Sequence, residues 1–158
     1  MSLQEERKRA RSIAFKFLAF KNRSVAEIFD HLEKKEISPD CAQSVVDELK
    51  ELKYVNDAEL ARQWGRSRIQ SRFWGSRRLL QELAQRGIKG ETAASALRDL
   101  YEEIDEFKLA EACAEKKMRT MAHLDRDKQR KRLAPFLERK GFPVSIIYAI
   151  LQTPTDDD

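Results

Sequence analysis

The chain has 158 residues and a formal net charge of +4; charged residues make up 37% of it and hydrophobic residues 41%. Because an ordinary domain carries about 25% charged residues, the excess predicts many exposed helical faces and little deep core. Glycine (5) and proline (4) are too scarce for the turns of a many-stranded sheet, and no apolar run approaches the roughly 18–20 residues of a membrane span. With no apolar signal segment at the N-terminus, we expect an all-α, cytoplasmic protein.

The first predicted unit covers residues 10–55 and contains three helices. The first helix is expected over Ala10–Phe20. The second starts at Ser24, which with Glu27 has the spacing of a capping box. The third starts next to Pro39, because proline is favoured in the first turn of a helix. Apolar residues recur at helical spacing in all three.

Two further units of three helices are predicted over residues 56–104 and 105–152. Their helices are expected at Asp57–Phe73, Ser76–Arg86, Glu91–Glu103, Glu106–His123, Lys128–Lys140 and Pro143–Leu151. Residues 153–158 end in three aspartates and are predicted to form a disordered acidic tail.

Three matching segments indicate that these units are repeats. They begin at Leu32, Leu83 and Leu137, and each continues with three mostly polar residues, a Gly or Glu, and a large apolar residue. Apolar positions before and after each segment also correspond, which makes a repeat the better interpretation. A unit of about 50 residues buries little apolar surface alone. We therefore expect neighbouring units to share apolar faces in an elongated, curved helical array.

The residue that ends the second helix differs among the units. Gly87 and Gly141 suit the left-handed conformation that closes a helix. Glu36 holds that place in the first unit. Since a non-glycine residue there costs on the order of 1 kcal/mol, a looser or differently built helix end is predicted at Glu36.

No pattern of catalytic residues is found along the sequence. His31 and His123 lack partners at metal-ligand spacing and are expected to be exposed. Cys41 and Cys113 are expected to be buried, reduced thiols. A glycine-rich phosphate loop and a nucleophile elbow are both missing. The sequence therefore predicts a protein that is not an enzyme and that needs no cofactor or metal.

Basic residues gather in two stretches that are candidate binding surfaces for a protein or nucleic-acid partner. The stretch from Arg62 to Arg78 contains no acidic residue and is the densest, so the middle unit is expected to carry the main basic surface. Ile69 and Phe73 either pack under the next unit beside merely solvated arginines, or share a contact surface for phosphates or acidic groups. The predicted contact residues are Arg62, Arg66, Arg68, Arg72, Arg77, Arg78, Lys128, Arg130, Lys131 and Arg132. A third cluster, over residues 7–11, is expected to be a flexible arm or a solvated end.

A longer pattern in the second unit points to a known family. It consists of Tyr54–Asp57, Leu60, Ala61, Trp64, Arg68, Trp74, Gly75, Arg78, Leu79, Leu83 and Arg86–Ile88. With Arg23 and Ser24 in the first unit, it resembles the RecX family of recombination regulators over about residues 10–151. Two positions depart from the family pattern: Asn56 stands where many members have aspartate, and Glu36 stands where glycine is expected.

The resemblance implies three tandem three-helix repeats and a regulatory function. Members of the family bind RecA recombinase filaments on DNA along the helical groove. They restrain RecA's ATP hydrolysis, strand exchange and co-protease activity. We expect a monomer with the RecA filament as partner, and direct contact with single-stranded DNA stays open.

Two other classes of function compete with this one. Three-helix units are also typical of helix-turn-helix DNA-binding regulators, which would act without RecA. The third helices, however, start with Pro39, Glu91 and Pro143, a poor set for reading bases in the major groove. The other class is a helical scaffold for an acidic protein.

Overall fold

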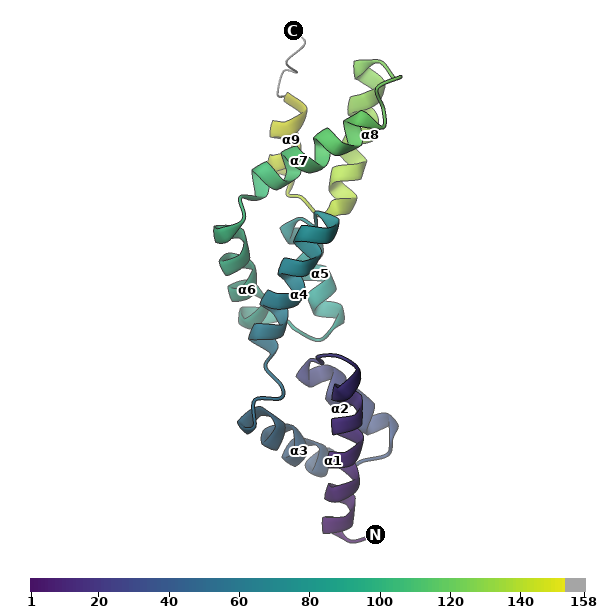
Figure 1. The fold of residues 1–158 in the computed structure, drawn as a ribbon, viewed down its shortest axis with the longest axis vertical. Helices are drawn as coiled ribbons and strands as arrows, with labels where there is room; N and C mark the ends of the chain where they lie inside the picture. The colour runs from purple at the N-terminus through teal and green to yellow at the C-terminus, as the bar shows by residue number, and fades with distance from the viewer. Residues whose placement is uncertain (153–158) are drawn as a thin grey trace.

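The computed structural model describes residues 1–152, which form nine α-helices and no strand. The helices are α1 (Leu3–Phe20), α2 (Val25–Lys34), α3 (Pro39–Glu51), α4 (Asp57–Arg72), α5 (Ser76–Gln85), α6 (Gly90–Glu103), α7 (Glu106–Arg119), α8 (Arg126–Lys140) and α9 (Val144–Gln152). Three groups of three follow one another along an elongated molecule (Figure 1). The predicted all-α tandem array is confirmed; the predicted acidic tail, residues 153–158, lies outside the described residues.

Side-chain caps in the sequence fix where most helices begin. The Oγ of Ser24 accepts a hydrogen bond from the N–H of Glu27 at 3.1 Å, and the Glu27 carboxylate accepts one from the N–H of Ser24 at 2.8 Å. The predicted capping box is therefore confirmed. Asn56, Asp105 and Asp125 cap α4, α7 and α8 with their side-chain oxygens.

The first helix is longer than the sequence predicts. Ser2 forms a capping box with Glu5, so α1 begins at Leu3 instead of Ala10. The basic residues of this segment lie on the helix, and Arg11 forms an ion pair of 3.0 Å with Glu48 of α3. The expectation of a flexible arm over residues 7–11 is wrong, because capping and pairing to α3 hold the segment.

The second helix of each repeat ends in the same way. Glu36, Gly87 and Gly141 have φ angles of +63°, +80° and +92°. The next residue in each case donates its N–H to the leucine five positions earlier, over 3.1 Å (Ile37 to Leu32), 2.9 Å (Ile88 to Leu83) and 3.3 Å (Phe142 to Leu137). The prediction of a looser or differently built end at Glu36 is therefore wrong.

Each repeat has its own hydrophobic core, and the expectation that neighbours share apolar faces is largely wrong. The three cores centre on fully buried residues of their own repeats: Ile28, Leu32 and Leu49; Leu79, Leu83 and Leu100; Leu137 and Phe142. Phe73 packs against the third core, which is one of the two alternatives open from the sequence, and Leu109 contacts both the second and the third. Ile69 stays in the core of its own repeat.

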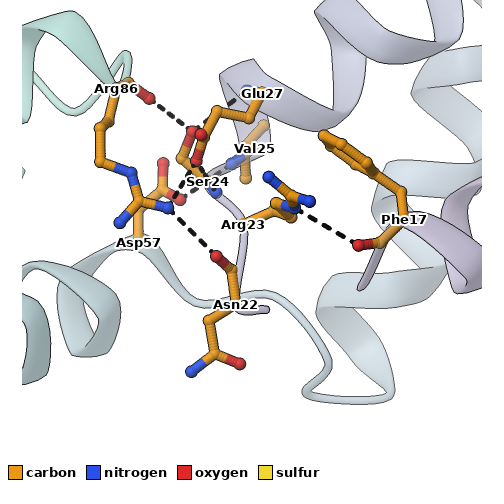
Figure 2. Close-up of polar contacts among 8 residues, drawn as sticks. All are labelled: Phe17, Asn22, Arg23, Ser24, Val25, Glu27, Asp57 and Arg86. Carbon is orange, nitrogen blue, oxygen red and sulfur yellow. Dashed lines mark hydrogen bonds and ion pairs between the residues drawn. The ribbon is translucent and has the colours of Figure 1, made fainter. Parts of the chain in front are cut away.

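Neighbouring repeats meet mainly through the ends of their second helices. At the first joint, the start of α2 lies on the end of α5 (Figure 2). The Oγ of Ser24 donates to the carbonyl oxygen of Arg86 at 2.5 Å, and the Arg86 guanidinium donates to Glu27 at 2.8 Å. Asp57, at the start of the second repeat, accepts a hydrogen bond from the N–H of Val25 at 2.9 Å.

The second joint repeats this arrangement between α5 and α8. Three backbone N–H groups at the start of α5 donate across it: Gly75 to the Lys140 carbonyl (2.7 Å), Ser76 to the Glu106 carboxylate (2.7 Å) and Arg77 to the Gly141 carbonyl (2.9 Å). The helices α8, α5 and α2 thus stand head to tail. The positive N-terminal end of one helix dipole faces the negative C-terminal end of the next, which is a favourable arrangement.

Candidate partner-binding surface

Two of the predicted contact arginines are used inside the second repeat. Arg62 and Arg66 extend from α4 to α6, where they pair with Asp99 at 3.8 Å and Glu103 at 3.0 Å. The acids that are missing from the Arg62–Arg78 stretch are therefore supplied by another helix. The expectation that all six arginines lack acidic neighbours is therefore wrong for Arg62 and Arg66.

Two more arginines lie over the tryptophans of the second repeat. The guanidinium of Arg68 lies 5.4 Å from the ring centre of Trp64, and that of Arg78 lies 4.7 Å from the ring centre of Trp74. Arg78 also donates to the carbonyl oxygen of Arg139 at 3.1 Å, across the second joint. These cation–π contacts give Arg68 and Arg78 a structural role.

The remaining two arginines, Arg72 and Arg77, are exposed and form no ion pair with any described residue. They lie at the end of α4 and the start of α5. The second joint brings α8 to them, and the Nζ of Lys140 donates to the carbonyl oxygen of Arg72 at 2.9 Å. We call Arg72, Arg77, Arg78, Arg139 and Lys140 the junction cluster. It joins the two basic stretches, which are distant in the sequence.

A second concentration of basic residues surrounds a groove of about 380 Å³ between the end of α7 and α8, which we call the α7–α8 groove. It is lined by Lys117, Thr120, Met121, His123, Lys131, Arg132, Pro135 and Arg139. No carboxylate is among these residues. Among the predicted contact residues, Lys131 and Arg132 are brought together here. Arg130 instead lines a groove beside α9, and Lys128 is exposed outside both.

The α7–α8 groove also contains residues that sequence reasoning missed. Lys117, Thr120 and His123 belong to α7 and the turn after it, where the predicted helix, Glu106–His123, ends early at Arg119. Thr120 turns the chain back by donating its hydroxyl to the Lys117 carbonyl at 2.6 Å. Basic residues recur three or four positions apart on α8, and this spacing could have predicted that side of the groove. Nothing in the sequence predicted which residues of α7 would lie opposite them.

Positive charge exceeds negative charge most in the third repeat. The expectation that the middle repeat carries the main basic surface is therefore wrong. Residues 105–152 contain eleven basic and seven acidic residues, against nine and seven in residues 56–104. Leaving Arg126 aside, no lysine or arginine of the third repeat forms an ion pair within the part of the chain that the structure describes. In the second repeat, by contrast, ion pairs between arginines and carboxylates neutralise much of the positive charge at the surface.

The histidines and cysteines are not gathered into one site. Cys41 and Cys113 are buried and free, as predicted, and burial raises the pKa of both thiols. His31 is half-buried and stacks on Phe17 with ring centres 3.9 Å apart, so the expectation of an exposed side chain is wrong there. Burial, with nearby cations, lowers the pKa of His31. Residues 1–152 contain no cluster of His, Cys, Asp and Glu that could hold a metal, and no helix among them could cross a membrane.

Three stacked cores, polar joints and exposed cations define a helical-repeat protein with a basic surface. Models of the first, second and third three-helix domains of RecX match residues 10–49, 56–97 and 103–151. The chain belongs to the RecX family.

Individual relatives are similar over almost the whole chain. The regulatory protein RecX of Streptomyces lividans is 30% identical, over 94% of this chain and 79% of the relative. That of Bacillus subtilis (strain 168) is 32% identical over 93% of this chain, which spans only 55% of the relative's length. The crystal structure of RecX from Lactobacillus salivarius has the same fold, with a TM-score of 0.84 at 23% identity, covering 94% of this chain and 96% of that one.

Proposed function

We propose that this protein binds RecA recombinase filaments on DNA and restrains RecA's ATP hydrolysis, strand exchange and co-protease activity. It acts as a monomer in the cytoplasm, where RecA and DNA meet. The family resemblance supplies the identity of the partner. The observation that carries the proposal is the junction cluster, which brings cations of the second and third repeats together at the second joint, with Arg72, Arg77 and Arg139 exposed.

The shape and charge of the molecule fit a periodic, acidic partner. Stacked repeats hold their surfaces at fixed separations, as solenoid proteins do, so one molecule reaches across neighbouring protomers of a filament. Arginine forks suit carboxylates and phosphates alike. A molecule bound across protomers resists the conformational cycling that ATP hydrolysis requires, and this bridging is the proposed source of inhibition.

The test measures ATP hydrolysis by RecA from the same organism on single-stranded DNA, with the native protein added up to and beyond stoichiometric ratios. The rate is expected to fall. The double variant Arg72→Glu and Arg77→Glu is expected to inhibit at least about tenfold less well, since it reverses two exposed charges (about 1.4 kcal/mol per tenfold). Arg66 and Arg78 are left unchanged because the ion pair of Arg66 and the cation–π contact of Arg78 stabilise the second repeat.

The matched control is Lys16→Glu with Lys50→Glu, two exposed lysines of the first repeat. This control should inhibit like the native protein. An unchanged hydrolysis rate at saturating native protein would contradict the proposal. A double variant as potent as the native protein would move the contact surface away from the junction cluster.

The helix-turn-helix alternative has less support. The helix α6 has a single basic residue, Arg98, which is paired with Glu91, and its exposed end carries Asp99, Glu102 and Glu103. It therefore offers no uncompensated cation to the DNA backbone. Footprinting on duplex DNA without RecA separates the two classes, because only the alternative gives a sequence-defined protected site.

A further inference from the structure

We propose that the α7–α8 groove is a binding site for the phosphodiester backbone of DNA. The site is assigned to the third repeat and needs no RecA, so it stands apart from the proposed function.

Cations enter the groove from both of its sides. Lys131, Arg132 and Arg139 come from α8, and Lys117 comes from the last turn of α7. The spacing of 131, 135 and 139 places these residues on one face of α8, and the turn over residues 120–124 brings α7 against it. A ligand in the groove therefore meets positive charge on opposite walls.

None of these four cations is neutralised by a described carboxylate. Lys117 is held by an aromatic ring, with its Nζ 5.0 Å from the ring centre of Phe136. The backbone of Arg139 is fixed by the hydrogen bond from Arg78, so its end of the groove is tied to the second joint. Keeping four like charges together without an acid costs stability, and a bound polyanion relieves that cost.

The composition of the lining favours phosphates over an acidic protein surface. Stable protein contacts centre on apolar or aromatic anchors, and Met121, which is 3% exposed, and Pro135 are the only apolar residues of the lining. No Phe, Tyr or Trp is present there to stack on bases. The groove can therefore neutralise a phosphate backbone, and it offers no aromatic surface on which bases would stack.

The experiment measures binding of labelled single-stranded and double-stranded oligonucleotides to the whole chain by fluorescence anisotropy, without RecA. The variant Lys117→Gln, Lys131→Gln, Arg132→Gln removes three charges while keeping side-chain length. We expect it to bind about tenfold more weakly at about 50 mM salt. The salt dependence of log K should lose roughly 2 units of slope on single strands and roughly 3 on duplex, according to the number of phosphates released.

Two further variants keep the result interpretable. Lys8→Gln, Lys16→Gln, Lys50→Gln removes the same charge from exposed positions of α1 and α3 and should bind like the native protein. The double variant Lys131→Gln, Arg132→Gln leaves the Lys117–Phe136 contact intact. If its affinity for DNA still falls about fivefold, the fall cannot come from misfolding of α7. Circular dichroism checks the helical content of each protein.

Each outcome decides the proposal. Selective loss in the groove variants supports it, and the two oligonucleotide arms then show whether single strands or duplex are preferred. Equal affinity of native and groove variants overturns it. Equal loss in the control variant overturns it too, because binding would then follow net charge alone. If the groove variants keep DNA affinity and lose affinity for poly-glutamate, the groove is a protein site. Inhibition of RecA is measured separately, so its failure leaves this result intact.

Discussion

At the residue scale, glycine is required where one repeat lies against the end of another helix. A Cβ on Gly87 would lie 2.2 Å from the Cβ of Ala26, and one on Gly141 would lie 2.2 Å from the Cβ of Arg78. Glu36 has the same left-handed conformation, but no repeat precedes the first one among the described residues. Its side chain is exposed, so a residue larger than glycine is accommodated at this place.

This difference predicts a large effect of Gly87→Ala. The substitution combines the cost of a left-handed alanine, about 1–2 kcal/mol, with overpacking at the joint, about 1–3 kcal/mol. We expect the free energy of unfolding to fall by about 3 kcal/mol, measured by urea denaturation. Gly90→Ala is the control, because Gly90 has φ +60° and no atom within 4 Å of an added Cβ. Equal losses at both positions would contradict steric crowding at the joint.

At the scale of elements, an acid at the start of one repeat caps a helix of the repeat before it. Asp57 accepts the N–H of Val25, and Glu106 accepts that of Ser76 in the same way. Burial tends to raise the pKa of Glu27, but hydrogen bonds from the N–H of Ser24 and from Arg86 hold that pKa below its usual value. The first joint therefore gains stability from Glu27 at neutral pH, and loses it as the pH falls through the lowered pKa.

The capping contact predicts that Asp57→Ala weakens the first joint. The N–H of Val25 loses its acceptor, so we expect a loss of about 1–2 kcal/mol in the free energy of unfolding. Asp40→Ala is matched to it, since Asp40 also lies in the first turn of a helix but is exposed and makes no hydrogen bond across a joint within residues 1–152. Thermal or urea unfolding of the two variants gives the comparison. A loss at Asp40 as large as at Asp57 would show that only the helix dipole matters.

At the scale of the whole molecule, three cores are joined by polar helix ends. Such an array resembles solenoid proteins, in which stability is a sum over units and their interfaces. Interfaces made of a few hydrogen bonds couple the units weakly. The packing of Phe73 and Leu109 couples the second and third repeats more than the first and second.

Weak coupling predicts that unfolding departs from a two-state transition. Trp64 and Trp74, the two tryptophans of the chain, both lie in the second repeat, so tryptophan fluorescence follows that repeat, whereas far-ultraviolet circular dichroism follows all nine described helices. The urea midpoints of the two signals are expected to differ, and the difference should widen in Gly87→Ala. Coincident transitions in the native protein would show that the joints couple the repeats fully.

Much of the fold could be predicted from the sequence because its signals are local. The signals are capping residues, helical spacing of apolar residues and helix-ending glycines, and each depends on a few neighbouring positions. They predicted that helices begin after Ser24 and Asn56 and that one ends before Gly141. The candidate site was predicted only in part. Six arginines in one stretch looked equivalent, but contacts with α6 and with two tryptophans leave only Arg72 and Arg77 free of ion pairs and cation–π contacts among the described residues.

The sequence by itself determined the helices, their threefold repetition and the family, since each is written in short-range patterns. Only the tertiary structure decided how charge is used. Ion pairs and cation–π contacts act between residues distant in the chain, so they cannot be seen in a linear pattern. They neutralise much of the middle repeat, leave the α7–α8 groove without acids, and make the third repeat the more basic surface.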